Sequence, residues 1–183
     1  KLFLKLFYSE NNIKKLSKNK KIDNIIVRPT MVYGSYNEIK DSNIEVIKKF
    51  LNILPFIVLP KESGLRQPIH AYQLSNVFFN LFIKFSNKTN KKLNNINLDI
   101  GGDEYISYEE MIRRVFEENK SNRTRKRLRV LFLPNKLFSL VVSPILLFSP
   151  KIHEALLRTM ANLSGFEKSY KFSTLKKSKF PFK

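Results

Sequence analysis

The stretch Ile25–Gly34, "IIVRPTMVYG", constrains the fold more than any other part of the chain. Three β-branched residues precede Arg28-Pro29, and Pro29 cannot donate the ladder hydrogen bond that would let a strand continue. A polar helical segment, residues 11–21, comes directly before it, and a continuous apolar run is typical of a strand buried in a parallel sheet. This order of helix and strand predicts an α/β fold with a doubly wound sheet.

The rest of the chain continues this alternation. Apolar residues at helical spacing predict helices over 44–54 and 107–116, where Ser107 and Glu110 have capping-box spacing. The alternation in "NINLDIGG" predicts a strand that ends at Gly101-Gly102. A short apolar strand near 130–133 and two helical runs between 135 and 163 complete the pattern.

A further helix is predicted over residues 72–85, and one stripe of it is expected to be core. The stripe consists of Leu74, Val77, Phe78, Leu81, Phe82 and Phe85.

Composition excludes several kinds of site. The chain has no Cys, which excludes disulfides and thiolate chemistry, and its two His, His70 and His153, lack metal-ligand spacing. The 34 Lys+Arg against 15 Asp+Glu give a net charge of +19, which would suit a polyanion. However, no zinc spacing, RNP-type pattern or recognition helix is present, so we expect solvated Lys and no nucleic-acid partner.

Four stretches, in this order and spacing, resemble the C-terminal half of the extended short-chain dehydrogenase/reductases, the NAD-dependent epimerases and dehydratases of nucleotide sugars. They are "IIVRPTMVYG", "GLRQPIHAYQLSNVFFNLF", "NLDIGGDEYISYEEMIRRVF" and, more loosely, "EALLRTMANLSGF". The resemblance implies the C-terminal part of a Rossmann-like doubly wound sheet with a mainly helical substrate-binding lobe. Residues 1–34 and 94–118 would belong to the sheet, and residues 35–93 and 119–183 to the substrate lobe and C-terminal helices.

The resemblance also implies site residues, because ligands in open α/β sheets lie beyond the carboxyl ends of the strands. Pro29, Thr30 and Val32 would contact the cofactor, which is NAD or NADP in the family. Met31 and Tyr33 would contact the substrate, a nucleoside-diphosphate sugar, and the guanidinium of Arg66 would hold its diphosphate. The family's activity would be epimerisation or dehydration by a cytoplasmic enzyme that can be a homodimer.

Two elements of the family are missing from the sequence. With 5 Gly in the whole chain, no Gly-rich turn is available for the cofactor's pyrophosphate. The catalytic Tyr-x-x-x-Lys pair is also absent, because Asn12 stands where the Lys after Tyr8 should be; Lys5 is only a weak candidate for that Lys. We therefore expect a truncated member of the family or an inactive relative, and no measurable NAD binding by the isolated chain.

His70 is expected to support the following helix by a hydrogen bond and not to act in catalysis. Where the family often has an acid, this chain has Tyr72-Gln73, which predicts a weaker helix N-terminus.

An alternative from another class is peripheral membrane binding through residues 123–149, where the basic "RTRKRLR" precedes an apolar stretch. Pro134, Lys136 and Pro144 argue against a spanning helix there. The same helices could instead cap the substrate lobe, and the sequence leaves both readings open.

Overall fold

The computed structural model describes residues 2–20, 23–35, 41–53, 56–86, 96–119 and 129–182, in which helices and strands alternate as the sequence predicts. The helices are α1 (Leu2–Lys20), α2 (Ser42–Ile53), α3 (Ala71–Ser86), α4 (Tyr108–Asn119), α5 (Asn135–Val142), α6 (Ile145–Phe148) and α7 (Pro150–Leu157), with 3-10 turns η3 (Arg158–Met160) and η4 (Ser169–Lys171). The strands are β1 (Ile25–Pro29), β2 (Val32–Tyr33), β3 (Phe56–Pro60), β4 (Leu65–Arg66), β5 (Ile69–His70), β6 (Ile96–Gly101), β7 (Ile106–Ser107), β8 (Arg129–Leu133) and β9 (Glu167–Lys168).

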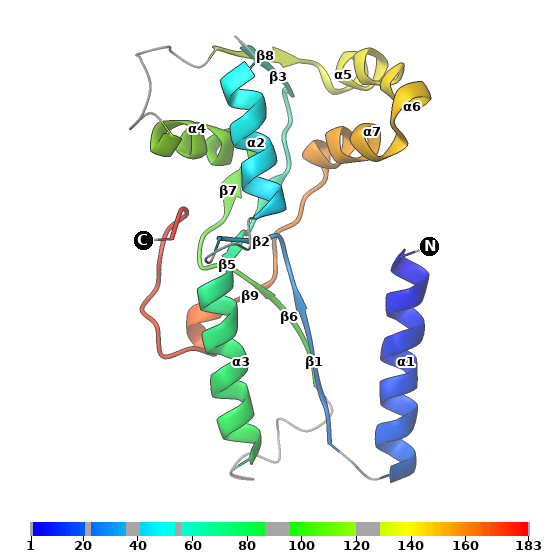
Figure 1. Ribbon diagram of the computed structural model, residues 1–183, viewed down its shortest axis with the longest axis vertical. Coiled ribbons are helices and arrows are strands. Elements are labelled where there is room, and N and C mark those ends of the chain that lie inside the picture. The colour runs from blue at the N-terminus through cyan, green and yellow to red at the C-terminus, as the bar shows by residue number, and fades with distance from the viewer. Residues whose placement is uncertain are drawn as a thin grey trace.

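A three-stranded parallel sheet with the order β1-β6-β9 lies at the centre. Ile25 pairs with Ile96 and Pro29 pairs with Ile100, so β1 and β6 end at the same edge. Figure 1 shows the two strands side by side, with α3 on one side of them and α1 on the other. Parallel strands separated in sequence by helices confirm the α/β fold class.

Three two-stranded pairs extend the structure beyond this sheet. The β2–β5 and β3–β8 pairs are parallel, and β4–β7 is antiparallel. β9 lies in the part of the chain that the sequence assigns to the substrate lobe, yet it pairs with β6. The division of the chain into sheet and lobe stays a prediction.

The prediction of a buried first strand is wrong in its degree of burial. The side chains of Ile25–Arg28 are only partly buried, and Pro29 is exposed. Among the described residues β1 pairs with β6 alone, so its other edge has no neighbouring strand. A continuous apolar run identifies a strand, but it does not tell how many layers cover that strand.

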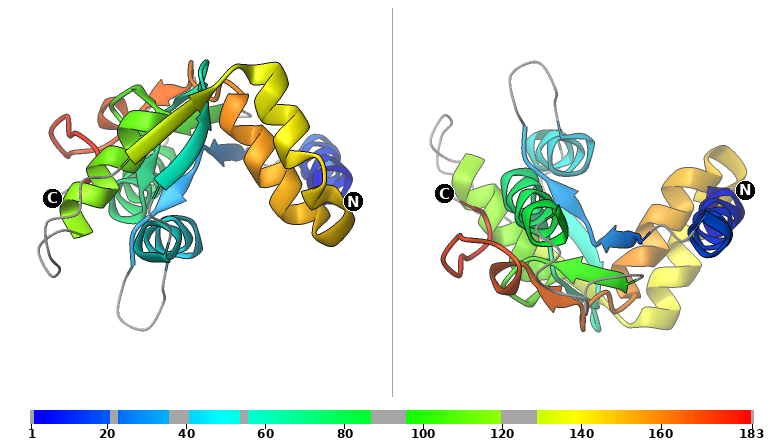
Figure 2. Two further views of the ribbon diagram at one scale, coloured as in Figure 1. Left: turned by 90° about the horizontal axis from the view of Figure 1, so that it is seen from above. Right: turned by 90° about the horizontal axis from the view of Figure 1, so that it is seen from below.

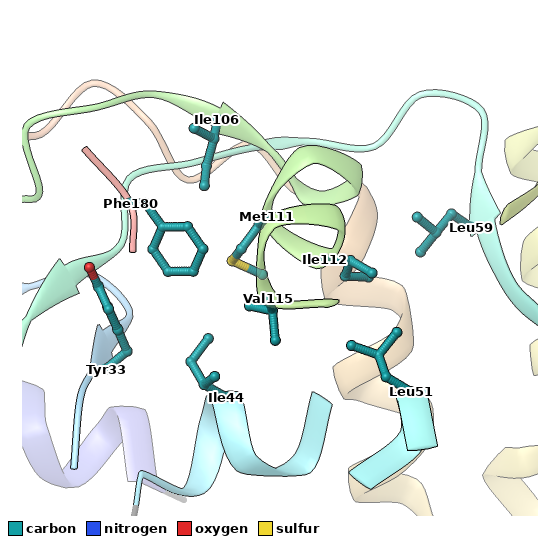
Figure 3. Packing of buried hydrophobic residues seen from close by; sticks show 9 residues of the cluster. All are labelled: Tyr33, Ile44, Leu51, Leu59, Ile106, Met111, Ile112, Val115 and Phe180. Atoms are coloured by element: carbon teal, nitrogen blue, oxygen red, sulfur yellow. The ribbon is translucent and has the colours of Figure 1, made fainter. Parts of the chain in front are cut away.

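The larger hydrophobic cluster, here named the α2–α4 core, joins the facing sides of α2 and α4. Figure 3 shows Met111 and Val115 of α4 directed towards Ile44 of α2, with Phe180 from the C-terminal segment beside them. The buried members of the α2–α4 core are Tyr33, Ile44, Leu51, Leu59, Ile106, Met111, Ile112, Val115 and Phe180.

The predicted cap of α4 is confirmed, because Ser107 accepts a hydrogen bond from the Glu110 backbone N–H at 3.0 Å.

The second cluster, the α3–β6 core, packs α3 against the central sheet. Val77 and Leu81 are buried against Leu98 and Ile100 of β6, as the predicted stripe requires. Two other residues of that stripe are not core, because Phe78 is 47% exposed and Phe82 is 69% exposed. The stripe is wider than the sheet beneath it, so its outer members reach solvent. The buried members of the α3–β6 core are Ile69, Val77, Leu81, Leu98 and Ile100.

Helices α5, α6 and α7 fold back on one another beyond β3 and β8, at one side of the molecule (Figure 2). Phe138 and Val142 anchor α5, since both are buried. Ser149 caps α7 by accepting a hydrogen bond from Ile152 N, and Pro150 follows in the first turn. The break predicted between two helical runs is confirmed here, with the short α6 placed before it.

Helix α1 is joined to the sheet by an ion pair. The Arg28 guanidinium donates to both carboxylate oxygens of Glu10, at 2.8 and 2.5 Å, and reaches Asp99 at 3.3 Å. Several apolar side chains of α1 remain exposed, including Leu4 at 55% and Tyr8 at 63%.

Candidate functional site at the carboxyl ends of β1 and β6

The four stretches that carry the family resemblance meet where β1 and β6 end. Thr30 donates its backbone N–H to the Ile100 carbonyl at 2.9 Å and its hydroxyl to the Gln67 carbonyl at 2.5 Å. Gln67 is 1% exposed, and its amide donates to the carbonyls of Gly102 at 2.7 Å and Phe166 at 3.1 Å. Hydrogen bonds therefore hold the end of β1, the β4–β5 turn and the end of β6 in one place.

A cleft of about 190 Å³ opens beside this junction. Within it the Tyr33 ring meets the His70 ring edge to face at 5.1 Å, and the Phe182 ring stacks on His70 at 5.0 Å. Phe182 also donates its backbone N–H to the Tyr33 hydroxyl at 2.8 Å, so the C-terminal segment closes one wall. The lining residues are Tyr33, Gly34, Ser35, Asp41, Ile44, Glu45, Lys48, His70, Glu118, Phe180, Pro181 and Phe182.

The two titratable rings of the cleft, those of Tyr33 and His70, are held in their neutral forms. Burial raises the pKa of the Tyr33 phenol, although the hydrogen bond from Phe182 acts in the opposite direction. Burial lowers the pKa of His70, against the attraction of the Asp41 carboxylate. A neutral phenol and a neutral imidazole can donate hydrogen bonds to a ligand, but they add no charge to the cleft.

His70 also supports the N-terminus of α3 by a hydrogen bond, as the sequence predicts. Its Nδ1 accepts a hydrogen bond from the Tyr72 backbone N–H at 3.1 Å, so the proton of the neutral ring belongs on Nε2. Gln73 Oε1 accepts from the His70 backbone N–H at 3.0 Å, which closes the cap from the other side. The expected weakness at this N-terminus is therefore offset by the amide that replaces the acid.

Asp41 is a site residue that the sequence reasoning missed. Its carboxylate accepts from the backbone N–H of Gly34 at 3.1 Å and of Ile44 at 3.2 Å, so it caps α2 and holds the turn after β2. Gly34 has a φ of +112°, and a Cβ there would lie 2.4 Å from His70 Nε2. The signal was available, because an Asp three residues before Ile44 has N-cap spacing.

Arg66 does not line this cleft. It is 3% exposed, and its guanidinium donates to the carbonyl of Leu65 at 3.0 Å and to the carbonyls of Ala161 and Arg158. The guanidinium carbon also lies 5.4 Å from the centre of the Tyr108 ring. Burial lowers the pKa of this guanidinium, which still remains charged at neutral pH. Its role as a diphosphate ligand stays a prediction.

The other predicted site residues, apart from Lys5, lie between the end of β1 and the end of β2. Met31 packs on the α2–α4 core and Val32 on the α3–β6 core, so the short segment alternates between two clusters. Only Tyr33 of the predicted set lines the cleft. Lys5 lies on the exposed surface of α1, where its carbonyl accepts from Ser9 Oγ at 2.9 Å. The ligand roles of these residues stay predictions.

Several solved structures are similar to this chain, including the following three. The UDP-glucuronic acid 4-epimerase from Bacillus cereus in complex with UDP-glucuronic acid and NAD matches 68% of this chain and 37% of its own at 21% identity, with a TM-score of 0.47. The same enzyme in complex with NAD matches 90% and 47% at 17% identity, with a TM-score of 0.47. The structure of gox2253 matches 84% and 41% at 15% identity, with a TM-score of 0.49.

No family model matches the chain, and no curated protein is significantly similar to it. The chain spans 37–47% of the length of the three solved structures above. Because the three TM-scores are below 0.5, these similarities do not establish a family. A function for this chain must therefore be argued from its own residues.

Proposed function

We propose that this chain forms the substrate side of an NAD-dependent enzyme that epimerises or dehydrates a nucleoside-diphosphate sugar. The supporting observation is the junction at Gln67, where motif stretches far apart in sequence are joined by direct hydrogen bonds. Ligands of open α/β sheets bind beyond the carboxyl ends of parallel strands, and this junction lies at that edge. The segment from Pro29 to Tyr33 would then be a wall of the sugar pocket.

The residues present fit only one end of the cofactor. Pro29 is exposed at the strand end and Thr30 follows it, so both could contact a nicotinamide ring. The sequence has no Gly-rich turn for the pyrophosphate, so these residues would hold only the nicotinamide end. Bound NAD would accept a hydride from a sugar carbon.

The proposed diphosphate contact sets a condition on Arg66. Because its guanidinium faces the carbonyls of Arg158 and Ala161, a diphosphate can reach it only if the segment after α7 moves aside. A charge-assisted, two-oxygen contact would then replace bonds to neutral carbonyls.

Calorimetric titration of the purified chain with uridine, thymidine and guanosine diphosphate sugars tests the proposal. We expect one of them to bind, Arg66→Lys to weaken that binding about tenfold through loss of the planar fork, and NAD not to bind measurably. Circular dichroism would verify that the variant is folded. Absence of binding by every sugar nucleotide would contradict the proposal, and micromolar NAD binding would contradict the argument from the missing Gly-rich turn.

A second candidate function is supported by the surface of α5–α7. Leu147 is 86% exposed and Phe148 is 88% exposed, and α5, α6 and α7 carry further exposed apolar side chains. No helix in the described residues is long and apolar enough to span a bilayer. Lys136, which is also exposed, precedes these apolar side chains in the sequence. Exposed apolar residues next to a positive charge suit attachment to the surface of an anionic membrane. The neighbouring exposed apolar residues are Leu137, Leu140, Val141, Leu146 and Ile152.

The basic segment that the sequence joins to this surface, residues 123–128, lies outside the described residues, and only Arg129 of "RTRKRLR" is described. Co-sedimentation with vesicles of phosphatidylserine and phosphatidylcholine tests the candidate function at low salt, where electrostatic attraction is strongest. We expect Leu147→Ser with Phe148→Ser to reduce binding at least tenfold.

The matched control is Phe79→Ser with Phe82→Ser on α3, where the side chains are 62% and 69% exposed. This pair removes similar apolar area from another face and should leave vesicle binding unchanged. Equal losses in the two pairs, or no binding by the parent chain, would eliminate the membrane function.

A further inference from the structure

A second cleft, of about 390 Å³, opens at the loop that follows β6. It lies between this loop, β9 and the C-terminal segment, which supply all its lining residues. They are Asp103, Glu104, Tyr105, Lys168, Lys177, Ser178 and Lys179. None of them was predicted as a site residue.

The two carboxylates of this cleft are already occupied. Asp103 is 4% exposed and accepts from Ser169 Oγ at 2.6 Å and from the backbone N–H groups of Tyr170 and Ser178, each at 3.0 Å. Glu104 accepts from Arg114 at 2.8 and 3.0 Å. Other donors therefore hold both carboxylates, and Glu104 is also attracted electrostatically to Lys179.

Within the part of the chain that the structure describes, Lys168, Lys177 and Lys179 form no ion pair within 4.0 Å. The Lys168 ammonium lies 5.2 Å from the centre of the Tyr105 ring, a cation–π contact that positions it without cancelling its charge. Positive charges that line one cleft repel each other, and a bound anion removes that repulsion.

The backbone that carries two of these lysines is fixed. Ser178 donates both its N–H and its hydroxyl to Asp103, at 3.0 and 3.3 Å, and its oxygen accepts from Gln73 at 2.7 Å. Lys177 and Lys179 flank this anchored residue, and Lys168 belongs to β9 of the central sheet. The cationic groups therefore arise from a preorganised scaffold, which lowers the entropy cost of ligand binding.

We infer that this cleft binds the phosphate groups of a small phosphorylated ligand through Lys168, Lys177 and Lys179. Three ammonium groups match the two or more negative charges of a diphosphate better than the single charge of a carboxylate. A volume of 390 Å³ leaves room for more than the phosphates. The inference does not rest on the proposed sugar-nucleotide function, because no residue of that site lines this cleft.

Titration of the full chain with inorganic pyrophosphate tests the inference. We expect Lys168→Ala, Lys177→Ala and Lys179→Ala together to weaken pyrophosphate binding at least tenfold. The matched control is Lys14→Ala, Lys15→Ala and Lys18→Ala, which removes the same charge from the exposed surface of α1 and should change binding less than twofold. Equal weakening in both triple variants, or no binding by the parent chain, would overturn the inference.

Further arms identify the source of the phosphate and separate the two proposed sites. Adenosine and uridine diphosphate that bind more tightly than pyrophosphate would indicate a nucleotide, and lysine-dependent binding to phosphatidic acid vesicles would indicate a lipid headgroup. Arg66→Lys should leave pyrophosphate binding unchanged. If it weakens pyrophosphate and nucleotide sugars alike while the lysine variant does not, the diphosphate site is at Arg66 and not in this cleft.

Discussion

The end of β6 and the α5–α7 layer satisfy the physical demands of a folded chain in opposite ways. At the end of β6, buried polar groups such as Gln67 and Asp103 are matched by hydrogen bonds from distant segments. In the α5–α7 layer the local backbone bonds are in place and Ser149 caps α7, but apolar side chains such as Phe148 remain in solvent. The first region is complete within the chain, and the second lacks a cover among the described residues.

This difference separates residues that stabilise the fold from residues that are free to contact a partner. Removing one partner of a buried polar network leaves several groups unsatisfied, which is costly. Removing an exposed apolar side chain costs little folding free energy and changes only what the surface can bind. Substitutions in the two regions should therefore differ strongly in their effect on unfolding.

The largest effect is expected for Asp103→Ala. The change leaves the Ser169 hydroxyl and the N–H groups of Tyr170 and Ser178 without their acceptor, so we expect a loss of about 4 kcal/mol in the free energy of unfolding. Urea denaturation measures it. Asp99→Ala, in the preceding strand β6 and with a side chain that is 54% exposed, should cost no more than about 0.5 kcal/mol. Similar losses in the two variants would refute the network argument.

Arg66→Ala should have the next largest effect. It removes a buried cation whose donors bind the carbonyls of Arg158 and Ala161, and we expect a loss of about 3 kcal/mol in the same denaturation experiment. The control is Arg158→Ala, whose side chain is 69% exposed and should be nearly neutral. An unchanged midpoint for Arg66→Ala would show that the carbonyls find other donors.

A smaller, pH-dependent effect is expected from His70. Burial holds its folded pKa below the unfolded value, so the unfolded state binds more protons, and stability falls as pH drops below about 6.5 towards the folded pKa. His70→Asn keeps a side chain that can cap α3 but does not titrate. We expect the decrease in Tm between pH 7 and pH 5.5 to be smaller in the variant, and parallel curves would exclude His70 as the cause.

The smallest effect on folding is expected for Phe148→Ser. Its side chain is 88% exposed, so the free energy of unfolding should change by less than about 0.5 kcal/mol. Urea denaturation in the absence of lipid measures it. A loss above about 1.5 kcal/mol would mean that this side chain is covered in solution, and the contrast between the two regions would then fail.

Local patterns predicted much of the fold. The Arg-Pro strand end, the alternation in β6 and the spacing of Ser107 and Glu110 each act over a few residues, and the structure confirms them. The burial of Phe78 and Phe82 was predicted wrongly, because periodicity gives the direction of a side chain but not the width of the surface opposite. The same limit explains the overestimated burial of β1.

The site was less predictable than the fold. The sequence pointed to the turn after β1, and the structure places Tyr33 in a cleft there. The sequence did not reveal the partners of Asp103, because Gln73 lies 30 positions earlier and the others lie between 66 and 75 positions later, and no local spacing links them. For Arg66, sequence identified a notable residue, but only the fold shows that its donors face carbonyls.

The bonds at Asp103 have a consequence for the order of events during synthesis. A ribosome makes the chain from its N-terminus, so the carboxylate exists long before Ser178, 75 positions later, can reach it. Contacts of such sequence separation close large loops and form slowly. Until the segment with Ser178 emerges, this acid must stay hydrated or bind other donors, so the β6 end is completed only after that later segment has been made.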